Sequence, residues 1–170
     1  MGFDLIAWNG SMSVRGTDEE IVEQLLQCNA DTAAYGLMLT EAQALALMES
    51  WSSSLRQTGR IEFGGDILKK MIGRFCDSPY ISAGDYEETL QTLIQMFYDA
   101  KNEMQDRIGD DRLLTYMKTA FDGPCRGSLE LLAGSVLPQA AAAIRAGRPL
   151  PAPEQFLNEH GLWMGEKEDV

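Results

Sequence analysis

Apolar residues recur at steps of three and four along most of the chain, which is the spacing of one face of an α-helix. The longest such run falls in residues 83–108, with apolar side chains at Tyr86, Leu90, Leu93, Phe97, Met104 and Ile108 and with Ala100 between them. A helix of this extent would be about 39 Å long. The pattern therefore predicts a long central helix against which the other helices pack.

The same spacing predicts helices over residues 17–28, 40–57, 67–75 and 110–122, and one bent or two short helices over 128–146. Two of these helices begin with the spacing of a capping box, Thr17 with Glu20 and Thr40 with Gln43. The expected buried positions are Ile21, Val22, Leu25 and Leu26 in the first, Ala42, Leu45, Met48, Trp51 and Leu55 in the second, Ile67, Leu68, Met71, Ile72 and Phe75 in the third, and Leu113, Leu114, Met117 and Phe121 in the fifth.

These elements favour an all-α fold: a single-domain bundle of five to seven helices around a long central helix. Residues 1–16 are expected to form an N-terminal arm, residues 17–148 the helical bundle, and residues 149–170 a C-terminal tail that contains three prolines. Polar and apolar residues alternate in residues 59–65, which would allow a short strand. No second segment could pair with such a strand, so a loop or a helix entry is the better interpretation.

Composition places the chain among globular proteins, because 45% of its residues are hydrophobic and 24% are charged. No apolar run approaches the roughly 20 residues of a membrane span. The first residues lack the basic and apolar regions of a secretory signal. The three cysteines, Cys28, Cys76 and Cys125, are too widely spaced for a zinc site and too few for a disulfide framework. A cytoplasmic protein without membrane contact is therefore expected.

The net charge of −12 comes from 26 acidic and 14 basic residues. No segment carries the basic stripe that phosphate contacts require, so nucleic acid is not an expected partner. A DNA-binding regulator built on the helices 17–28 and 40–57 remains only a third hypothesis. The acidic balance favours solubility but does not select a partner.

Catalytic and cofactor motifs do not assemble in this sequence. Gly59 and Gly64 have the spacing of a phosphate-binding loop, but Gly65 and Asp66 follow where Lys and Ser or Thr are needed. The single histidine, His160, lies in the tail, away from any nucleophile of the bundle. The carboxylates of Asp99, Glu103 and Asp106 lack the Glu-x-x-His pair of a di-metal bundle and are better explained as a solvated face paired with Lys101 and Arg107. We expect no metal and no cofactor.

Two kinds of candidate site remain. A ligand could bind near the two ends of the helix 67–75, where the polar and aromatic residues Arg60, Glu62, Phe63, Asp77 and Tyr80 stand in non-helical segments. The same residues could instead lock two tight turns. Cys125, between Pro124 and Arg126 at an expected helix start, is a candidate reactive thiol, because positive charge and a helix dipole would stabilise its thiolate.

Five short motifs stand out along the chain: Tyr35-Gly36-Leu37, Leu39-Thr40-Glu41, Gly59-Arg60-Ile61-Glu62-Phe63-Gly64, Cys76-Asp77-Ser78-Pro79-Tyr80-Ile81 and Gly127-Ser128-Leu129-Glu130-Leu131-Leu132. Together they resemble a family of small uncharacterised helical bacterial proteins. The similarity runs from about Thr17 to Ile144 and omits the arm and the tail. The resemblance implies a helical, cytoplasmic protein and transfers no catalytic role.

The function hypothesis that follows is a non-enzymatic interaction module, which binds another protein or a second copy of itself through an apolar helical face. It rests on missing catalytic groups and on plentiful apolar helices rich in methionine, although a fold alone does not define a function. The alternative is a small-ligand binder or enzyme with a site around Arg60, Glu62, Asp77 and Tyr80.

Overall fold

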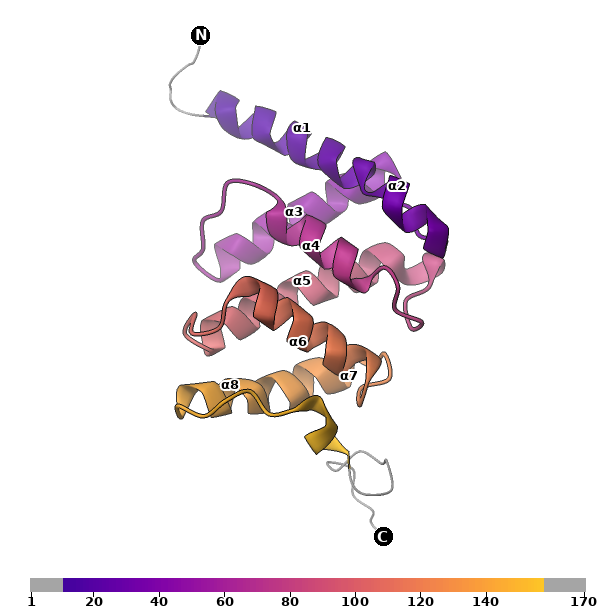
Figure 1. The fold of residues 1–170 in the computed structure, drawn as a ribbon. Helices are drawn as coiled ribbons and strands as arrows, with labels where there is room; N and C mark the ends of the chain where they lie inside the picture. The colour runs from indigo at the N-terminus through magenta and orange to yellow at the C-terminus, as the bar shows by residue number, and fades with distance from the viewer. Residues whose placement is uncertain (1–10, 158–170) are drawn as a thin grey trace.

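The helices form two layers, which the chain visits alternately (Figure 1). The computed structural model describes residues 11–157, with side chains from Asp18 onward. One layer contains α1 (Ser11–Gln27), α4 (Asp66–Phe75) and α6 (Asp110–Asp122), and the other contains α3 (Glu41–Gln57), α5 (Tyr86–Glu103) and α8 (Leu137–Arg145). The described residues contain no β-strand, which confirms the all-α fold. None of their helices is long and apolar enough to cross a membrane.

Successive helices pair across the layers as three stacked helical hairpins. In the first, α1 packs on α3; in the second, α4 packs on α5. In the third, α6 packs on a π-helical turn, η3 (Leu132–Val136), which joins the short α7 (Leu129–Leu131) to α8. Within the layers, α5 lies between α3 and α8, and α4 lies between α1 and α6. Each hairpin thus buries one face against the next, and the first hairpin forms one end of the stack.

The predicted apolar faces of α4, α5 and α6 are confirmed, because every side chain expected there is buried. The capping box at the start of α3 is also confirmed: the Gln43 N–H donates to the Thr40 hydroxyl, and the Thr40 N–H donates to the Gln43 side chain. Of the two alternatives predicted for residues 128–146, one helix or two, the structure has one continuous helical stretch over residues 129–145 with a π-helical turn inside it, and the Ser128 side chain caps it by accepting from the Leu131 N–H.

The long helix predicted over residues 83–108 is wrong in its length. A 3-10 turn, η2 (Ala83–Asp85), precedes α5, and α5 ends at Glu103, so its 18 residues barely exceed the 17 of α1 and α3. The chain leaves the helix because Gln105 and Asp106 adopt positive φ angles of 58° and 57°. Met104 and Ile108 nevertheless remain buried, since the turn folds them back onto the core. Periodicity alone could not reveal this turn.

The predicted start of the first helix is also wrong, because α1 begins at Ser11 rather than at Thr17. Residues 11–16 of the expected arm are therefore helical, and residues 1–10 lie outside the described part of the chain. In α3 the predicted face is correct at Met48, Trp51 and Leu55 but wrong in the first turns. Ala44 and Leu47 are buried there, whereas Ala42 is exposed and Leu45 is 44% exposed.

The first part of the expected tail packs on the third hairpin. The Tyr116 hydroxyl donates to the Pro151 carbonyl oxygen at 2.8 Å, and the 3-10 turn η4 (Pro153–Phe156) buries Phe156. The remaining tail residues, His160 among them, lie outside the described part. At the other end of the chain, α2 (Asn29–Thr32) and the 3-10 turn η1 (Ala33–Tyr35) connect α1 to α3.

Candidate functional site

The loop of residues 58–65 begins with a tight reversal at the end of α3. Gly59 has a φ angle of 72°, which a side chain with a Cβ adopts only at a cost. This conformation lets the Arg60 N–H donate to the Leu55 carbonyl at 2.8 Å and closes the helix. The predicted end of the helix 40–57 is thus confirmed, and the segment that follows is a loop rather than a strand.

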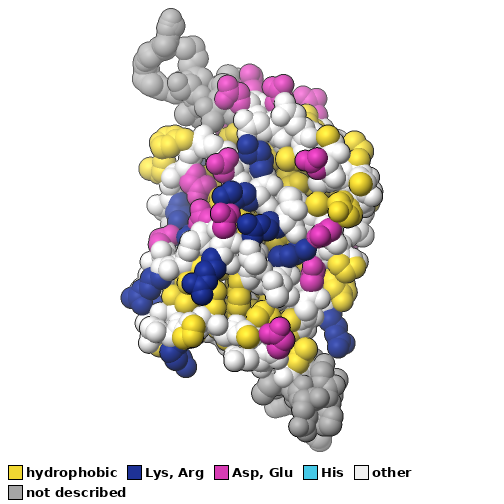
Figure 2. Space-filling view, in the orientation of Figure 1, with side chains coloured by type: hydrophobic (Ala, Val, Ile, Leu, Met, Phe, Trp, Pro, Cys, Tyr) yellow, Lys and Arg dark blue, Asp and Glu magenta, His cyan; other side chains and the backbone are white. Residues whose placement is uncertain are grey.

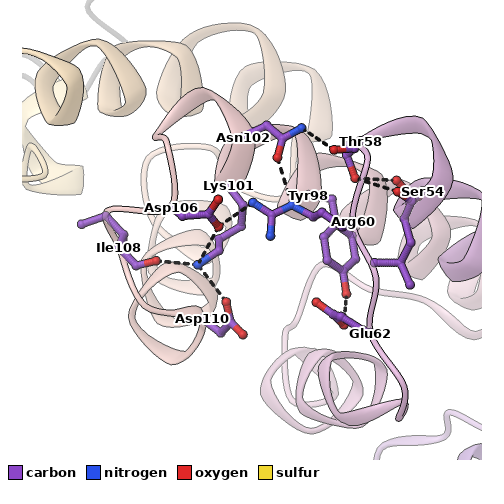
Figure 3. A network of polar contacts seen from close by, with 11 residues as sticks. Ser54, Thr58, Arg60, Glu62, Tyr98, Lys101, Asn102, Asp106, Ile108 and Asp110 are labelled. Carbon is purple, nitrogen blue, oxygen red and sulfur yellow. Dashed lines mark hydrogen bonds and ion pairs between the residues drawn. The ribbon is translucent and has the colours of Figure 1, made fainter.

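Arg60 ties this loop to the carboxyl end of α5 (Figure 3). Its Nε donates to the Asn102 side-chain oxygen at 2.9 Å, and its Nη2 lies 2.5 Å from the Asp106 carboxylate. The Asn102 amide in turn donates to the Thr58 carbonyl at 2.9 Å. Two side chains of α5 and its following turn therefore hold both ends of the reversal.

Glu62 forms the second attachment of the loop. Its carboxylate accepts a hydrogen bond of 2.8 Å from the Tyr98 hydroxyl, which itself accepts one of 3.0 Å from the Trp51 indole N–H. Burial raises the pKa of the Tyr98 hydroxyl, and the neighbouring Glu62 raises it further. The phenol stays protonated and remains a donor to Glu62. This chain of three side chains joins α3, α5 and the loop.

Lys101 supports the turn that carries Asp106. Its side chain is buried, and its ammonium group donates to the Ile108 carbonyl at 2.6 Å. The same group lies 2.9 Å from the Asp110 carboxylate and 3.8 Å from that of Asp106 (Figure 3). A buried ammonium group needs such partners to offset its lost hydration. The Asp106 carboxylate is therefore fixed between Lys101 and Arg60.

The two apolar side chains of the same loop point the other way. Ile61 is 79% exposed and Phe63 is 84% exposed, which makes them the most exposed of the large apolar side chains that the structure describes. Figure 2 shows hydrophobic side chains protruding at the upper left, where this loop lies in Figure 1. The alternation in residues 60–63 thus places charged groups inward and apolar groups outward.

A hollow of about 330 Å³ lies beside Phe63 and is lined partly by Lys70 and Asp110.

Asp77 and Tyr80 lie at the opposite end of α4 and contact α6. The Lys118 ammonium group binds the Asp77 carboxylate at 2.6 Å and that of Asp122 at 3.1 Å. The hydrogen bond from Lys118 holds the pKa of Asp77 below its usual value. The Ser78 hydroxyl donates to Asp122 at 2.6 Å, and the Tyr80 ring packs edge-on against Phe121 with 6.3 Å between the ring centroids.

The five ligand-binding candidates therefore fall into two separate groups. Arg60, Glu62 and Phe63 precede α4, and Asp77 and Tyr80 follow it (Figure 1). The ten residues of α4 separate the groups by about 15 Å along its axis. The charged groups of Arg60, Glu62 and Asp77 are already bound to α5, to its following turn or to α6. This geometry favours the interpretation that these residues lock turns, and it does not support one groove built from all five.

The environment of Cys125 does not favour the reactive thiol predicted there. Cys125 is buried, and burial raises the pKa of its thiol to about 11, so a thiolate is disfavoured at neutral pH. The residue follows the end of α6, where its N–H donates to the Ala120 carbonyl, instead of starting a helix.

The sequence predicts that Lys101 and Arg107 pair with the carboxylates of Asp99, Glu103 and Asp106. Lys101 does so with Asp106, whereas Arg107 donates to the carbonyl oxygen of Ile144 at 3.2 Å. Among the described residues, no group of three or more His, Cys, Asp or Glu side chains is placed to hold a metal ion.

Three buried tyrosines give a testable dependence on alkaline pH. Burial raises the pKa of Tyr86, Tyr98 and Tyr116, that of Tyr86 to about 12, whereas an unfolded tyrosine ionises near pH 10. Because the folded state binds these protons more tightly, its stability is complete below about pH 10 and falls as the pH rises above that value. In a variant with Tyr35→Phe and Tyr80→Phe, only the buried three remain. Their tyrosinate absorbance should appear together with the loss of helical circular dichroism. Ionisation while the helical signal is intact would contradict this.

The structure is thus an all-α protein of three stacked helical hairpins, in which the loop of residues 58–65 connects α3 to α4. The chain belongs to a family of unknown function (DUF6323), whose model matches residues 24–150. The matched region includes the loop, the second and third hairpins, α3 and the first residues of the proline-containing segment, but only the last turn of α1. Comparison with curated proteins and with solved structures gave no match. The family membership agrees with the resemblance found from the sequence and assigns no activity.

Most of the anchoring side chains cannot be recognised from the sequence. Helical spacing predicts a core face for Trp51 and a solvated face for Lys101, and it gives no role to Tyr98 or Asn102. The alternation in residues 60–63 is the available signal, because charged residues at every second position of a loop between two helices can all point toward the body of the protein. The helix whose side chains bind these charged groups depends on tertiary packing.

Proposed function

We propose that this protein is a non-enzymatic interaction module that docks a partner protein through Ile61 and Phe63. The observation that carries the proposal is their exposure, 79% and 84%, in a loop whose intervening charged residues are bound to the body. Exposed apolar side chains that lie close together commonly mark protein–protein interaction sites. The partner expected from this chemistry presents an apolar pocket with polar surroundings.

The anchoring of the loop supports the proposal energetically. Fully burying a Phe or Ile side chain contributes roughly 1.5–3 kcal/mol each, so the pair can supply a substantial part of a binding free energy. A mobile loop would lose part of this gain when it became ordered on binding. The contacts of Arg60 to Asp106 and of Glu62 to Tyr98 hold the backbone beforehand and reduce that loss.

The proposal changes the kind of surface that the sequence favoured. An apolar helical face was expected, but most apolar residues of the described helices are buried within the two layers. The exposed apolar pair lies on a loop instead. The alternative of a ligand site around Arg60, Glu62, Asp77 and Tyr80 gains no support from the geometry, since α4 separates these residues into two groups.

The proposal is tested with a double variant, Ile61→Ser with Phe63→Ser, in a tagged protein recovered from its native host. The wild type should recover a stoichiometric partner or sediment as an oligomer, and the double variant should do neither while its melting temperature stays unchanged. The matched control is Tyr35→Ser with Met38→Ser, which removes two apolar side chains that are 56% and 58% exposed elsewhere. The control should behave as the wild type does. A monomeric wild type without a partner, or equal recovery by both variants, would overturn the proposal.

A further inference from the structure

A second surface lies at the end of the hairpin stack, between α1 and α3. It is a groove of about 490 Å³ whose floor is apolar, with Val22 and Leu26 one turn apart on α1 and Leu45 on α3. Val22 and Leu26 are half-buried and Leu45 is 44% exposed, although their neighbours Ile21, Leu25 and Ala44 are buried in the core. The second hairpin has a hairpin on each side, whereas the first, like the third, has a neighbouring hairpin on one side only within the described residues.

All the charged residues that line the rim of this groove are acidic, within the part of the chain whose side chains the structure describes. Its charged lining residues are Asp18, Glu19, Glu23 and Glu41. Within the part of the chain whose side chains the structure describes, none of these four carboxylates forms an ion pair. Figure 2 shows acidic side chains gathered over α1. Residues 16–55, which include most of α1 and nearly all of α3, contain seven acidic residues and neither lysine nor arginine.

We infer that the groove between α1 and α3 binds a basic amphipathic helix of another protein. Such a helix would place its apolar face on Val22, Leu26 and Leu45 and its lysines or arginines against the carboxylates on both sides. The apolar floor favours an amphipathic segment. The negative charge of the rim attracts basic partners and repels acidic ones. This site lies outside the loop that carries Ile61 and Phe63, so it is a second docking surface.

Binding is measured with the full chain and synthetic helical peptides of about 18 residues, which is roughly five turns. The probe is an amphipathic Leu/Lys peptide with leucines at steps of three and four. One comparison peptide has the same composition in an order without a single apolar face, and the other replaces lysine by glutamate. We expect saturable binding of the first peptide alone, measured by fluorescence anisotropy, and an affinity that falls as salt rises. Equal binding of the reordered peptide would show charge attraction without a groove and would overturn the inference.

Variants of the protein show where on its surface the peptide binds. Glu23→Lys with Glu41→Lys should weaken binding by about tenfold or more, because both rim charges are reversed. The matched control, Glu49→Lys with Glu88→Lys, changes the net charge equally at exposed positions outside the groove and should bind nearly as the wild type does. Leu45→Asp should also abolish binding, and all variants should keep the helical content of the wild type. Equal weakening by the control pair would contradict the site.

Other occupants of the groove would be recognised in the same experiment. Loss of peptide binding in the Ile61→Ser, Phe63→Ser variant would move the peptide to the loop and overturn this inference, while leaving the proposed function in place. A wild-type dimer that Glu23→Lys with Glu41→Lys dissociates would assign the groove to a second copy. Peptide binding that appears only after removal of residues 1–10 would assign it to the chain's own start. Each of these results would contradict a basic partner helix.

Discussion

Replacing Gly127 by alanine is expected to destabilise the protein by about 3 kcal/mol or more, because two costs add at this position. Gly127 has a φ angle of 82°, in the left-handed region that a Cβ disfavours. An added Cβ would also lie 2.4 Å from the Cβ of Tyr80 and 2.6 Å from its Cγ. These are the near atoms of the side chain, so a change of rotamer cannot relieve the contact at Cβ. The free energy of unfolding is measured by urea denaturation.

The matched control for this substitution is Gly36→Ala. Gly36 has a similar φ angle of 76°, but an added Cβ there would meet no atom within 4 Å. Only the backbone cost of about 1–2 kcal/mol is expected. Equal effects of the two substitutions would mean that the segment of Tyr80 does not pack on the reversal after α6 as described. The comparison therefore tests whether the residues after α4 lock a turn.

Phe121→Ala is expected to cost about 3–5 kcal/mol, the usual range for emptying a phenylalanine site in a core. The ring is buried and meets the rings of Phe75 and Tyr80 edge-on, at centroid distances of 5.6 Å and 6.3 Å. Its removal would leave a cavity where α4, α6 and the segment between α4 and α5 meet. For a chain of this size, the melting temperature should fall by roughly 10 °C or more.

Phe63→Ala is the informative control for Phe121→Ala, since it deletes the same atoms from a ring that is 84% exposed. A surface substitution of this kind should change the free energy of unfolding by no more than about 0.5 kcal/mol. A large loss at Phe63 would mean that its ring packs within the protein, and it would then not be available to a partner. The pair of variants separates a side chain that stabilises the fold from one that does not.

Helical periodicity predicted the core of the protein well because it depends only on local geometry. All five apolar residues expected in α4 are buried, as are those expected in α6. The same reasoning was less reliable where a helix has two apolar faces. In α1, Ile21 and Leu25 face the core while Val22 and Leu26 line the groove, and in α3 Leu45 lies outside the face that Ala44 and Leu47 bury. Sequence spacing shows which residues share a face, but not which neighbouring helix covers it.

The errors of the sequence analysis arise from contacts between segments that are distant in the chain. α5 ends at Glu103, and the turn that follows brings Asp106 to Arg60 and to Lys101. The residues near Asp106 in the sequence do not predict these ion pairs. Cys125 looked activated beside Arg126, yet packing buries its sulfur after the end of α6. The sequence identifies the candidate residues around α4 as polar and aromatic residues of non-helical segments, and Arg60, Glu62, Asp77 and Tyr80 all make tertiary contacts. Only the tertiary structure shows which elements those contacts join.

Site-specific photo-crosslinking tests most directly whether the loop of residues 58–65 is a docking surface. A benzophenone amino acid is placed at position 63 in one protein and at position 35 in another, since Phe63 and Tyr35 are both exposed aromatic residues. After irradiation in the native host, we predict one dominant crosslinked species from position 63 and none from position 35. Crosslinking from position 35 alone, or from neither position, would contradict the proposal that Ile61 and Phe63 bind a partner.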